Sequence, residues 1–165
     1  SSGDEFLFGE ARVTVFGADG HNVGHIVYWM PDSSELFVGD TIFSLGCGKL
    51  FEGSPQQMWT TLASLRELPS ETLVYCAHEY TLENAEYALL AEPGNGALQA
   101  RVKECKALRA MGRPTVPSTL GSEKACNPFL RLESREIQRF VGAEGRELWE
   151  VFGATRASKD EFDSA

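Results

Sequence analysis

The sequence contains no long apolar run, and this absence excludes a helical membrane protein. None of its hydrophobic stretches approaches the roughly 20 residues that a membrane-spanning helix needs. The first residues also lack the basic and then apolar pattern of a secretory signal peptide. We therefore expect a cytoplasmic protein that makes no membrane contact, with the mitochondrial matrix as the remaining alternative.

Positive charge is scarce, and the cysteines are few and scattered. Asp and Glu outnumber Lys and Arg by 24 to 15, which gives a formal net charge of -9. Proteins that bind nucleic acids concentrate positive charge, so we expect no nucleic-acid partner.

Cysteines at positions 47, 76, 105 and 126 form no CxxC pair, and we expect them to be reduced thiols rather than a disulfide framework.

The first half of the 165 residues has the composition of a β-sheet. Segments 5–16, 26–29, 36–38 and 72–76 are rich in β-branched and aromatic residues, and turn residues separate them, which predicts one sheet. The run Ser-Pro-Gln-Gln at 54–57 predicts a capped helix that starts at residue 55 and ends near residue 68.

Helical periods replace the strand pattern after Tyr80. They predict helices over 81–91 and 97–111, the second one closed by Gly112, and further helical turns over 133–152. Two prolines in 112–118 predict an extended connector. We therefore expect an α/β domain over residues 1–80 and a small all-helical domain over residues 81–165.

All three histidines of the chain lie in short segments that follow predicted strands. His21 and His25 follow the first hairpin, Asp40 follows the next strand pair, and His78 follows the fourth predicted segment. Ligands bind beyond strand ends in α/β folds, so these side chains can converge although they are distant in sequence. Imidazole and carboxylate suit zinc or iron. A core or surface role is the better explanation of any single histidine, and only the shared placement of all three after strands makes a metal site an equal alternative.

Five ordered motifs, which together span nearly the whole chain, resemble the glyoxalase II family. They are GDTIFSLGCGKLFEG at 39–53, YCAHEYT at 75–81, PTVPSTL at 114–120, NPFLR at 127–131 and KDEF at 159–162. Members of this family are hydroxyacylglutathione hydrolases of the metallo-β-lactamase superfamily. The resemblance implies an α/β fold, with the second half of a metallo-β-lactamase αββα sandwich followed by a small helical domain that binds glutathione.

The same resemblance implies a metal site with three ligands in this chain. His21 would bind the first of two divalent ions, Asp40 would bridge both ions as the catalytic carboxylate, and His78 would bind the second. We expect zinc, with iron or manganese as alternatives, because histidine and carboxylate accept all three metals. His25 is not among the implied ligands, and we expect it to have a supporting or structural role.

One signature of the family is absent from these 165 residues. The His-x-His-x-Asp-His run supplies the remaining ligands of both ions, so the metal site of this chain would be incomplete. We expect the chain to correspond to the later part of the family's fold and to expose an apolar sheet face that carries Ile26, Tyr28 and Val74. Such a face would bind the missing first segment or drive self-association.

Similarity places the contacts with glutathione on three cations and three other side chains. The residues are Lys49, Phe51, Tyr80, Asn84, Arg156 and Lys159. Cations suit a peptide with carboxylates at both ends, whereas without the resemblance they would be interpreted as solvated surface charge. Phe51 lacks the hydroxyl group that some relatives have at this position.

The function that the resemblance implies is hydrolysis of S-D-lactoylglutathione and other 2-hydroxyacylglutathiones to glutathione and the free acid. This is the last step of methylglyoxal detoxification, and a hydroxide bound between the two metal ions would attack the thioester carbonyl. Two alternatives remain open: a truncated, catalytically inactive module that still binds glutathione thioesters, and a site that another chain completes.

Overall fold

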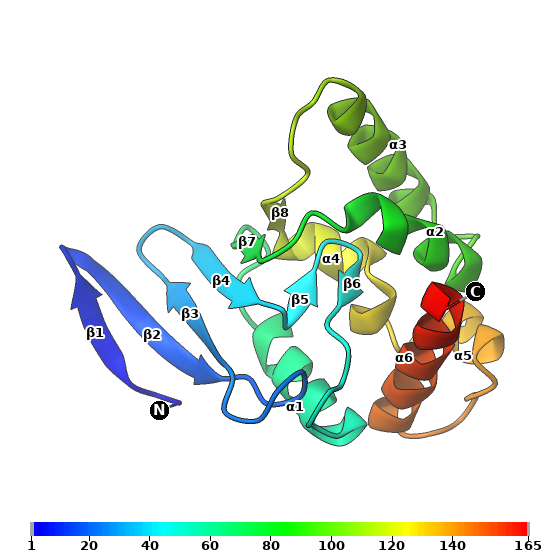
Figure 1. Ribbon diagram of the computed structural model, residues 1–165, viewed down its shortest axis with the longest axis horizontal. Helices are drawn as coiled ribbons and strands as arrows, with labels where there is room; N and C mark the ends of the chain where they lie inside the picture. Colours follow the sequence, from blue (N-terminus) through cyan, green and yellow to red (C-terminus); the bar gives the residue numbers. More distant parts are fainter. Residues whose placement is uncertain (1, 165) are drawn as a thin grey trace.

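The computed structural model describes residues 2–164, in which a six-stranded sheet is flanked by helices (Figure 1). The strands lie in the order β1 (Glu5–Phe8), β2 (Ala11–Gly17), β3 (Ile26–Met30), β4 (Glu35–Gly39), β7 (Leu73–Cys76) and β8 (Ser118–Thr119). The first four strands pair antiparallel, β7 pairs parallel with β4, and β8 pairs antiparallel with β7. The predicted sheet is confirmed, and β8 is a strand that the sequence did not predict.

The connection from β4 to β7 contains a two-stranded hairpin and then helix α1. The hairpin consists of β5 (Ile42–Phe43) and β6 (Gly46–Cys47), and α1 spans Pro55–Arg66. Ser54 and Gln57 form the predicted capping box, since each side chain bonds to the backbone N–H of the other. The helix ends two residues earlier than predicted, because proline at position 69 disfavours helical backbone at Leu68.

One face of the sheet packs on α1. Val27, Leu36 and Val74 are at most 2% exposed, and they share a core cluster with Met58 and Leu62 of the helix. The prediction that Val74 lies on an uncovered face is therefore wrong. Side chains alternate along a strand, so its neighbour Tyr75 points to the opposite face.

The second half is helical apart from β8. It contains α2 (Thr81–Ala91), α3 (Gly96–Ala110), α4 (Leu120–Cys126), the 3₁₀ turn η1 (Pro128–Leu130), α5 (Arg135–Phe140) and α6 (Leu148–Ser164). The predicted helix over 81–91 is confirmed, and α3 is shifted by one residue from the prediction. Gly112 follows α3 with φ +69, a backbone conformation that glycine adopts without strain. The helical turns predicted over 133–152 form α5 and the start of α6, which continues to Ser164.

The core does not divide at residue 80. Buried side chains of the sheet, of α1, of η1 and of α6 form one continuous cluster, and α6 packs directly on α1. The boundary between a first and a second domain therefore stays a prediction.

None of the helices formed by residues 2–164 combines the length and the apolar character needed to cross a membrane. All four cysteines are free thiols, as expected.

The sheet face opposite α1 is apolar and uncovered in this chain. We call it the open face and define it by Phe6, Ile26, Tyr28, Phe37 and Tyr75. Of these, Ile26, Tyr28 and Phe37 are 37%, 39% and 40% exposed. The rings of Phe37 and Tyr75 stack at 4.9 Å, and Phe6 meets Tyr28 edge-on at 6.2 Å, so the aromatic side chains form a patch rather than isolated exposed residues.

We expect the open face to make the chain self-associate in a concentration-dependent manner. Replacing Tyr28 and Phe37 together with Thr keeps strand preference but removes two rings from the patch, so the variant should shift towards the monomer in sedimentation velocity. Leu90→Gln, which removes an exposed leucine from α2, is the matched control and should not change the association. A monomer at every concentration in the unmodified chain would contradict the prediction.

Candidate metal centre and substrate pocket

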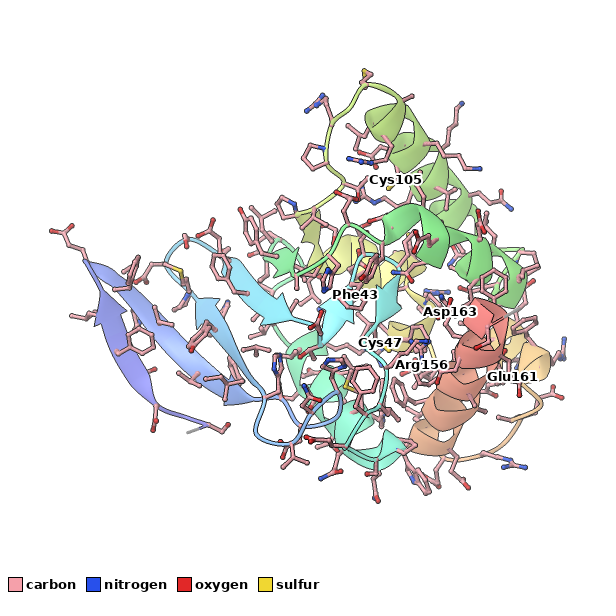
Figure 2. All side chains as sticks on the ribbon, viewed as in Figure 1. Phe43, Cys47, Cys105, Arg156, Glu161 and Asp163 are labelled. Carbon is pink, nitrogen blue, oxygen red and sulfur yellow. The ribbon has the colours of Figure 1, made fainter. Side chains whose placement is uncertain are left out.

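A cavity with a volume of about 480 Å³ lies where the strand ends meet α6. Every site residue predicted from the sequence lines it, although these residues come from positions as far apart as 21 and 159. The lining also includes five residues that the sequence analysis did not select: Phe43, Cys47, Gly48, Glu83 and Asp163. Figure 2 labels Cys47 of the β5–β6 hairpin beside Arg156 of α6, to whose guanidinium its backbone carbonyl oxygen is hydrogen-bonded.

The three predicted metal ligands converge at one end of this cavity. Asp40 lies between two imidazoles: its Oδ2 is 3.7 Å from Nε2 of His21, and its Oδ1 is 3.3 Å from Nε2 of His78. Asp40 Oδ1 is buried and has no hydrogen-bond partner among residues 2–164. A buried carboxylate oxygen without a hydrogen bond, flanked by two imidazole nitrogens, has the arrangement of a bridging metal ligand.

Backbone contacts set the orientation of His21. Its Nδ1 lies 2.7 Å from the carbonyl oxygen of Lys49, and because a carbonyl only accepts, Nδ1 carries the proton. The lone pair is then on Nε2, the atom that faces Asp40. Gly48 makes this approach possible, since a Cβ atom there would lie 2.0 Å from the Asp40 carbonyl oxygen and 2.9 Å from His21 Nδ1.

These donors fit one side of a two-metal centre. Imidazole and carboxylate match the preference of zinc and iron, but each ion would receive only one imidazole and one oxygen of the shared Asp40. In the part of the chain that the structure describes, no group of three or more His, Cys, Asp or Glu side chains is placed so that it could hold a metal ion, so the three predicted ligands do not form a site by themselves. The Nε2 atom of His25 lies 3.3 Å from the Val38 carbonyl oxygen, and its ring packs against Gly39, next to Asp40, which suits the supporting or structural role expected for it.

Aromatic rings hold the donors in place. His78 stacks on Tyr80 at 4.7 Å with an angle of 13° between the rings, and Phe43 contacts both rings edge-on. The ring of His21 lies 5.0 Å from that of Phe51. Tyr80 and Phe51 are 41% and 69% exposed, so these two predicted substrate contacts stand at the mouth of the cavity.

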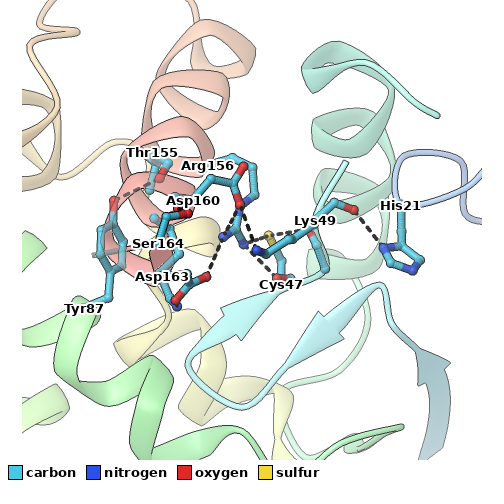
Figure 3. A network of polar contacts seen from close by, with 11 residues as sticks. His21, Cys47, Lys49, Tyr87, Thr155, Arg156, Asp160, Asp163 and Ser164 are labelled. Atoms are coloured by element: carbon cyan, nitrogen blue, oxygen red, sulfur yellow. Dashed lines mark hydrogen bonds and ion pairs between the residues drawn. The ribbon is translucent and has the colours of Figure 1, made fainter. Parts of the chain in front are cut away.

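The other end of the cavity carries the predicted cations. Arg156 and Lys159 are 3% and 4% exposed, so their interpretation as solvated surface charge is wrong. Arg156 donates from Nη1 to the Cys47 carbonyl oxygen at 2.9 Å and from Nη2 to Asp160 at 3.1 Å (Figure 3). The side chain of Lys49 is half exposed, and its Nζ lies 4.0 Å from Asp160.

Two neighbouring groups complete the chemistry of the cavity. Asn84 donates from Nδ2 to the Ser44 carbonyl oxygen at 3.2 Å, which leaves its Oδ1 available to a ligand. Burial raises the pKa of the Cys47 thiol to about 11, although Arg156 opposes this rise. A raised pKa keeps the Cys47 thiol protonated at neutral pH, and a protonated thiol is a poor nucleophile.

Two buried polar residues, Glu123 and Asn127, form hydrogen bonds with the backbone of the β5–β6 hairpin. The hairpin needs this support because Leu45 has φ +61, a left-handed conformation that is strained for a β-branched or bulky residue. Glu123, which is fully buried, accepts the Leu45 backbone N–H at 2.9 Å. Asn127 donates to the carbonyl oxygens of Phe43 and Gly46 at 3.2 and 2.9 Å. The NPFLR motif pointed to Asn127, whereas nothing in the sequence distinguished Glu123.

A second network fixes the loop that carries His78. The adjacent Glu79 accepts the Thr115 backbone N–H at 2.9 Å and also bonds to the hydroxyl groups of Thr115 and Thr81. Burial alone would raise the pKa of Glu79, but these hydrogen bonds outweigh it and hold the pKa below its ordinary value. The connector over 112–118 is thereby tied to the candidate metal ligand.

Comparisons with known proteins agree with this geometry. Residues 79–162 match the family described as hydroxyacylglutathione hydrolase C-terminus, and residues 1–78 match the metallo-beta-lactamase superfamily. Hydroxyacylglutathione hydrolases of Rhodospirillum rubrum and Methylococcus capsulatus are 53% and 52% identical to this chain over 160 residues. These two matches cover 97% of the chain, which spans 62% of the length of either relative.

Solved structures with low sequence identity share the fold. ETHE1 from Myxococcus xanthus is 23% identical, with a TM-score of 0.57 over 96% of this chain and 57% of the other. The BLEG-1 B3 metallo-beta-lactamase is 20% identical, with a TM-score of 0.54 over 79% of this chain and 47% of the other. The mixed α/β fold expected from the sequence is thus confirmed.

We expect the chain to bind divalent metal weakly, because Asp40 and one imidazole leave most positions around each ion to water. Zn²⁺ should be removed by dialysis, and Asp40→Asn should lower the affinity by roughly tenfold or more in calorimetric titration. Asp32→Asn makes the same change at an exposed aspartate in the turn between β3 and β4, and this matched control should bind as the unmodified chain does. Two Zn²⁺ ions per chain that survive exhaustive dialysis would show that further ligands exist.

The buried carboxyl of Glu123 should make stability fall as pH rises. Burial raises its pKa above the ordinary 4.5, so above that pH the unfolded chain loses the proton while the folded chain keeps it. Between pH 4.5 and the raised pKa of Glu123, Glu123→Gln should therefore gain free energy of unfolding relative to the unmodified chain, by at most about 1.4 kcal/mol per pH unit, measured by denaturant titration. The exposed Glu86→Gln should show no such trend, and a pH-independent difference for Glu123→Gln would contradict the assignment.

Proposed function

Because the chain belongs to the hydroxyacylglutathione hydrolase family, we propose that its cavity binds a glutathione thioester and forms one side of the site that hydrolyses it. The substrate would be a 2-hydroxyacylglutathione such as S-D-lactoylglutathione, which yields glutathione and D-lactate in the last step of methylglyoxal detoxification. The observation that carries the proposal is that one cavity has metal donors at one end and buried cations at the other.

Three residues at the strand ends would hold the metal. Two divalent ions bound by His21, Asp40, His78 and further ligands would lower the pKa of bound water to near 7 and polarise the thioester carbonyl. Asp40 presents one carboxylate oxygen towards each imidazole, and the Lys49 carbonyl keeps the lone pair of His21 directed at it. The family match implies divalent metal, and zinc is our proposal for its identity.

The cations would anchor the peptide part of the substrate. Arg156 and Lys159 are almost fully buried, and burial strengthens their attraction for a carboxylate. Lys49, whose side chain is half exposed, adds a third positive charge. Tyr80 and Asn84 also line the cavity and would offer a hydroxyl group and an amide oxygen to the peptide. A cavity of about 480 Å³ is of the size that small-molecule sites usually have. Held in this way, the acyl end of the thioester would reach the metal donors.

A chimera tests the proposal: this chain replaces the matched segment of the Rhodospirillum rubrum relative, and loss of S-D-lactoylglutathione is followed by its thioester absorbance. The chimera should hydrolyse the substrate when it is loaded with Zn²⁺. Binding of S-methylglutathione without hydrolysis would favour the alternative, a catalytically inactive binding module. Neither binding nor hydrolysis would overturn the proposal.

Variants of this chimera should distinguish residues that anchor the substrate, which affect KM, from residues that act in the hydrolysis step, which affect kcat. Arg156→Ala and Lys159→Ala remove attraction that substrate and transition state share, so KM should rise by roughly tenfold while kcat stays within a few fold. Asp40→Asn should instead lower kcat by about a hundredfold or more. Lys103→Ala removes an exposed cation from α3 and should change neither constant. A fall in kcat at unchanged KM for Arg156→Ala would contradict the anchoring role.

A further inference from the structure

The cations that would anchor the substrate already have carboxylate partners on their own helix. Arg156 Nη2 lies 3.1 Å from Asp160 and 3.6 Å from Asp163, and Lys159 Nζ contacts Asp163 one turn further on. Figure 3 shows the carboxylates of Asp160 and Asp163 on either side of the Arg156 guanidinium. An incoming carboxylate therefore meets cations that are already paired.

The two acids differ in their position relative to the cavity. Asp163 lines it together with Arg156 and Lys159, whereas Asp160 is not part of the lining and connects Arg156 with Lys49. Asp163 thus occupies the side of the cations from which a ligand approaches. Its carboxylate stands where the carboxylate of a bound peptide would bond.

Burial explains why the cations need such a partner. The side chains of Arg156 and Lys159 are 4% and 5% exposed, and a charge this far from water is costly unless it is paired. The side chain of Asp163 is 27% exposed and lies in the last turn of α6, so it can return to water at lower cost than the cations can. Arg156 would stay in place without it, because Asp160 and the Cys47 carbonyl oxygen still bind its guanidinium.

The charges also balance in a way that limits affinity. Lys49, Arg156 and Lys159 carry three positive charges, and Asp160 and Asp163 cancel two of them, which leaves one. Displacing Asp163 leaves two charges for the ligand. Part of the binding free energy is used to break the ion pairs of Asp163 with Arg156 and Lys159. The ligand is therefore bound less tightly than it would be if these cations had no carboxylate partner.

We propose that Asp163 is an internal counterion that occupies the substrate carboxylate position in the free protein and must be displaced when a glutathione conjugate binds. This inference rests on the proposed function, since it takes the glutathione carboxylate as the ligand. Asp163 sets affinity and dissociation rate, and its return to the cations speeds release of the glutathione product. It is a positioning residue that touches the anchoring cations and takes no part in the chemistry at Asp40.

The test is calorimetric titration of the chain with S-methylglutathione, together with the dissociation rate constant from surface plasmon resonance. Asp163→Asn keeps the shape of the side chain and removes its charge, so affinity should rise by roughly threefold to tenfold, mostly through slower dissociation. Asp163→Glu retains the carboxylate and should bind within about twofold of the unmodified chain. Thermal melts check folding, and Asp163→Ser serves in place of Asp163→Asn if that variant is unfolded.

Glu161→Gln is the matched control, because it removes the same charge from the same helix at an exposed position. It should leave affinity within about twofold, since an exposed charge outside the cavity lining is screened by solvent. Unchanged or weaker binding by Asp163→Asn, or an equal gain in Glu161→Gln, would overturn the counterion role. If the unmodified chain and Asp163→Asn both fail to bind S-methylglutathione, the proposed function fails and this inference fails with it.

Discussion

The parallel pairing of β4 with β7 is the constraint on which the candidate site depends. Antiparallel neighbours would place the ends of these strands at opposite edges of the sheet, whereas parallel neighbours place Asp40 and His78 at the same edge. A hydrogen bond from the Ala77 N–H to the Gly39 carbonyl oxygen, 3.0 Å long, continues the pairing up to these two residues. Parallel strands need a long crossover, and here the crossover contains α1, which covers one face of the sheet.

Helix α1 also determines where the second half of the chain can pack. Because α6 lies on α1, the guanidinium of Arg156 reaches the carbonyl oxygen of Cys47 and closes the cavity opposite the metal donors. The hydrophobic packing of two helices thus fixes the separation between the cations and the strand ends. The cavity therefore depends on packing between the first and the second half of the chain, which share one large core cluster.

Local signals in the sequence predicted most elements, and contacts between distant segments account for what they missed. Ser54 and Gln57 located the start of α1, and the placement of the histidines after strands indicated that they would meet. The face on which Val74 lies could not be predicted, because strand alternation gives two faces without saying which one a helix covers. Glu123 and Asp163 were missed for a related reason: each acts through a partner, Leu45 or Arg156, that only the tertiary structure brings near.

The hydrogen bonds that build the cavity join residues far apart along the chain, and this has a consequence for the order of folding. Leu45 and Glu123 are 78 residues apart, and Cys47 and Arg156 are 109 apart. Contacts of such long range form late, because the loops between them must close first. During synthesis, the strand ends that carry His21, Asp40 and His78 emerge from the ribosome well before α6. The nascent chain would therefore expose these three side chains before Arg156 and Lys159 reach the cavity, and the part of the lining that α6 contributes is the last to form.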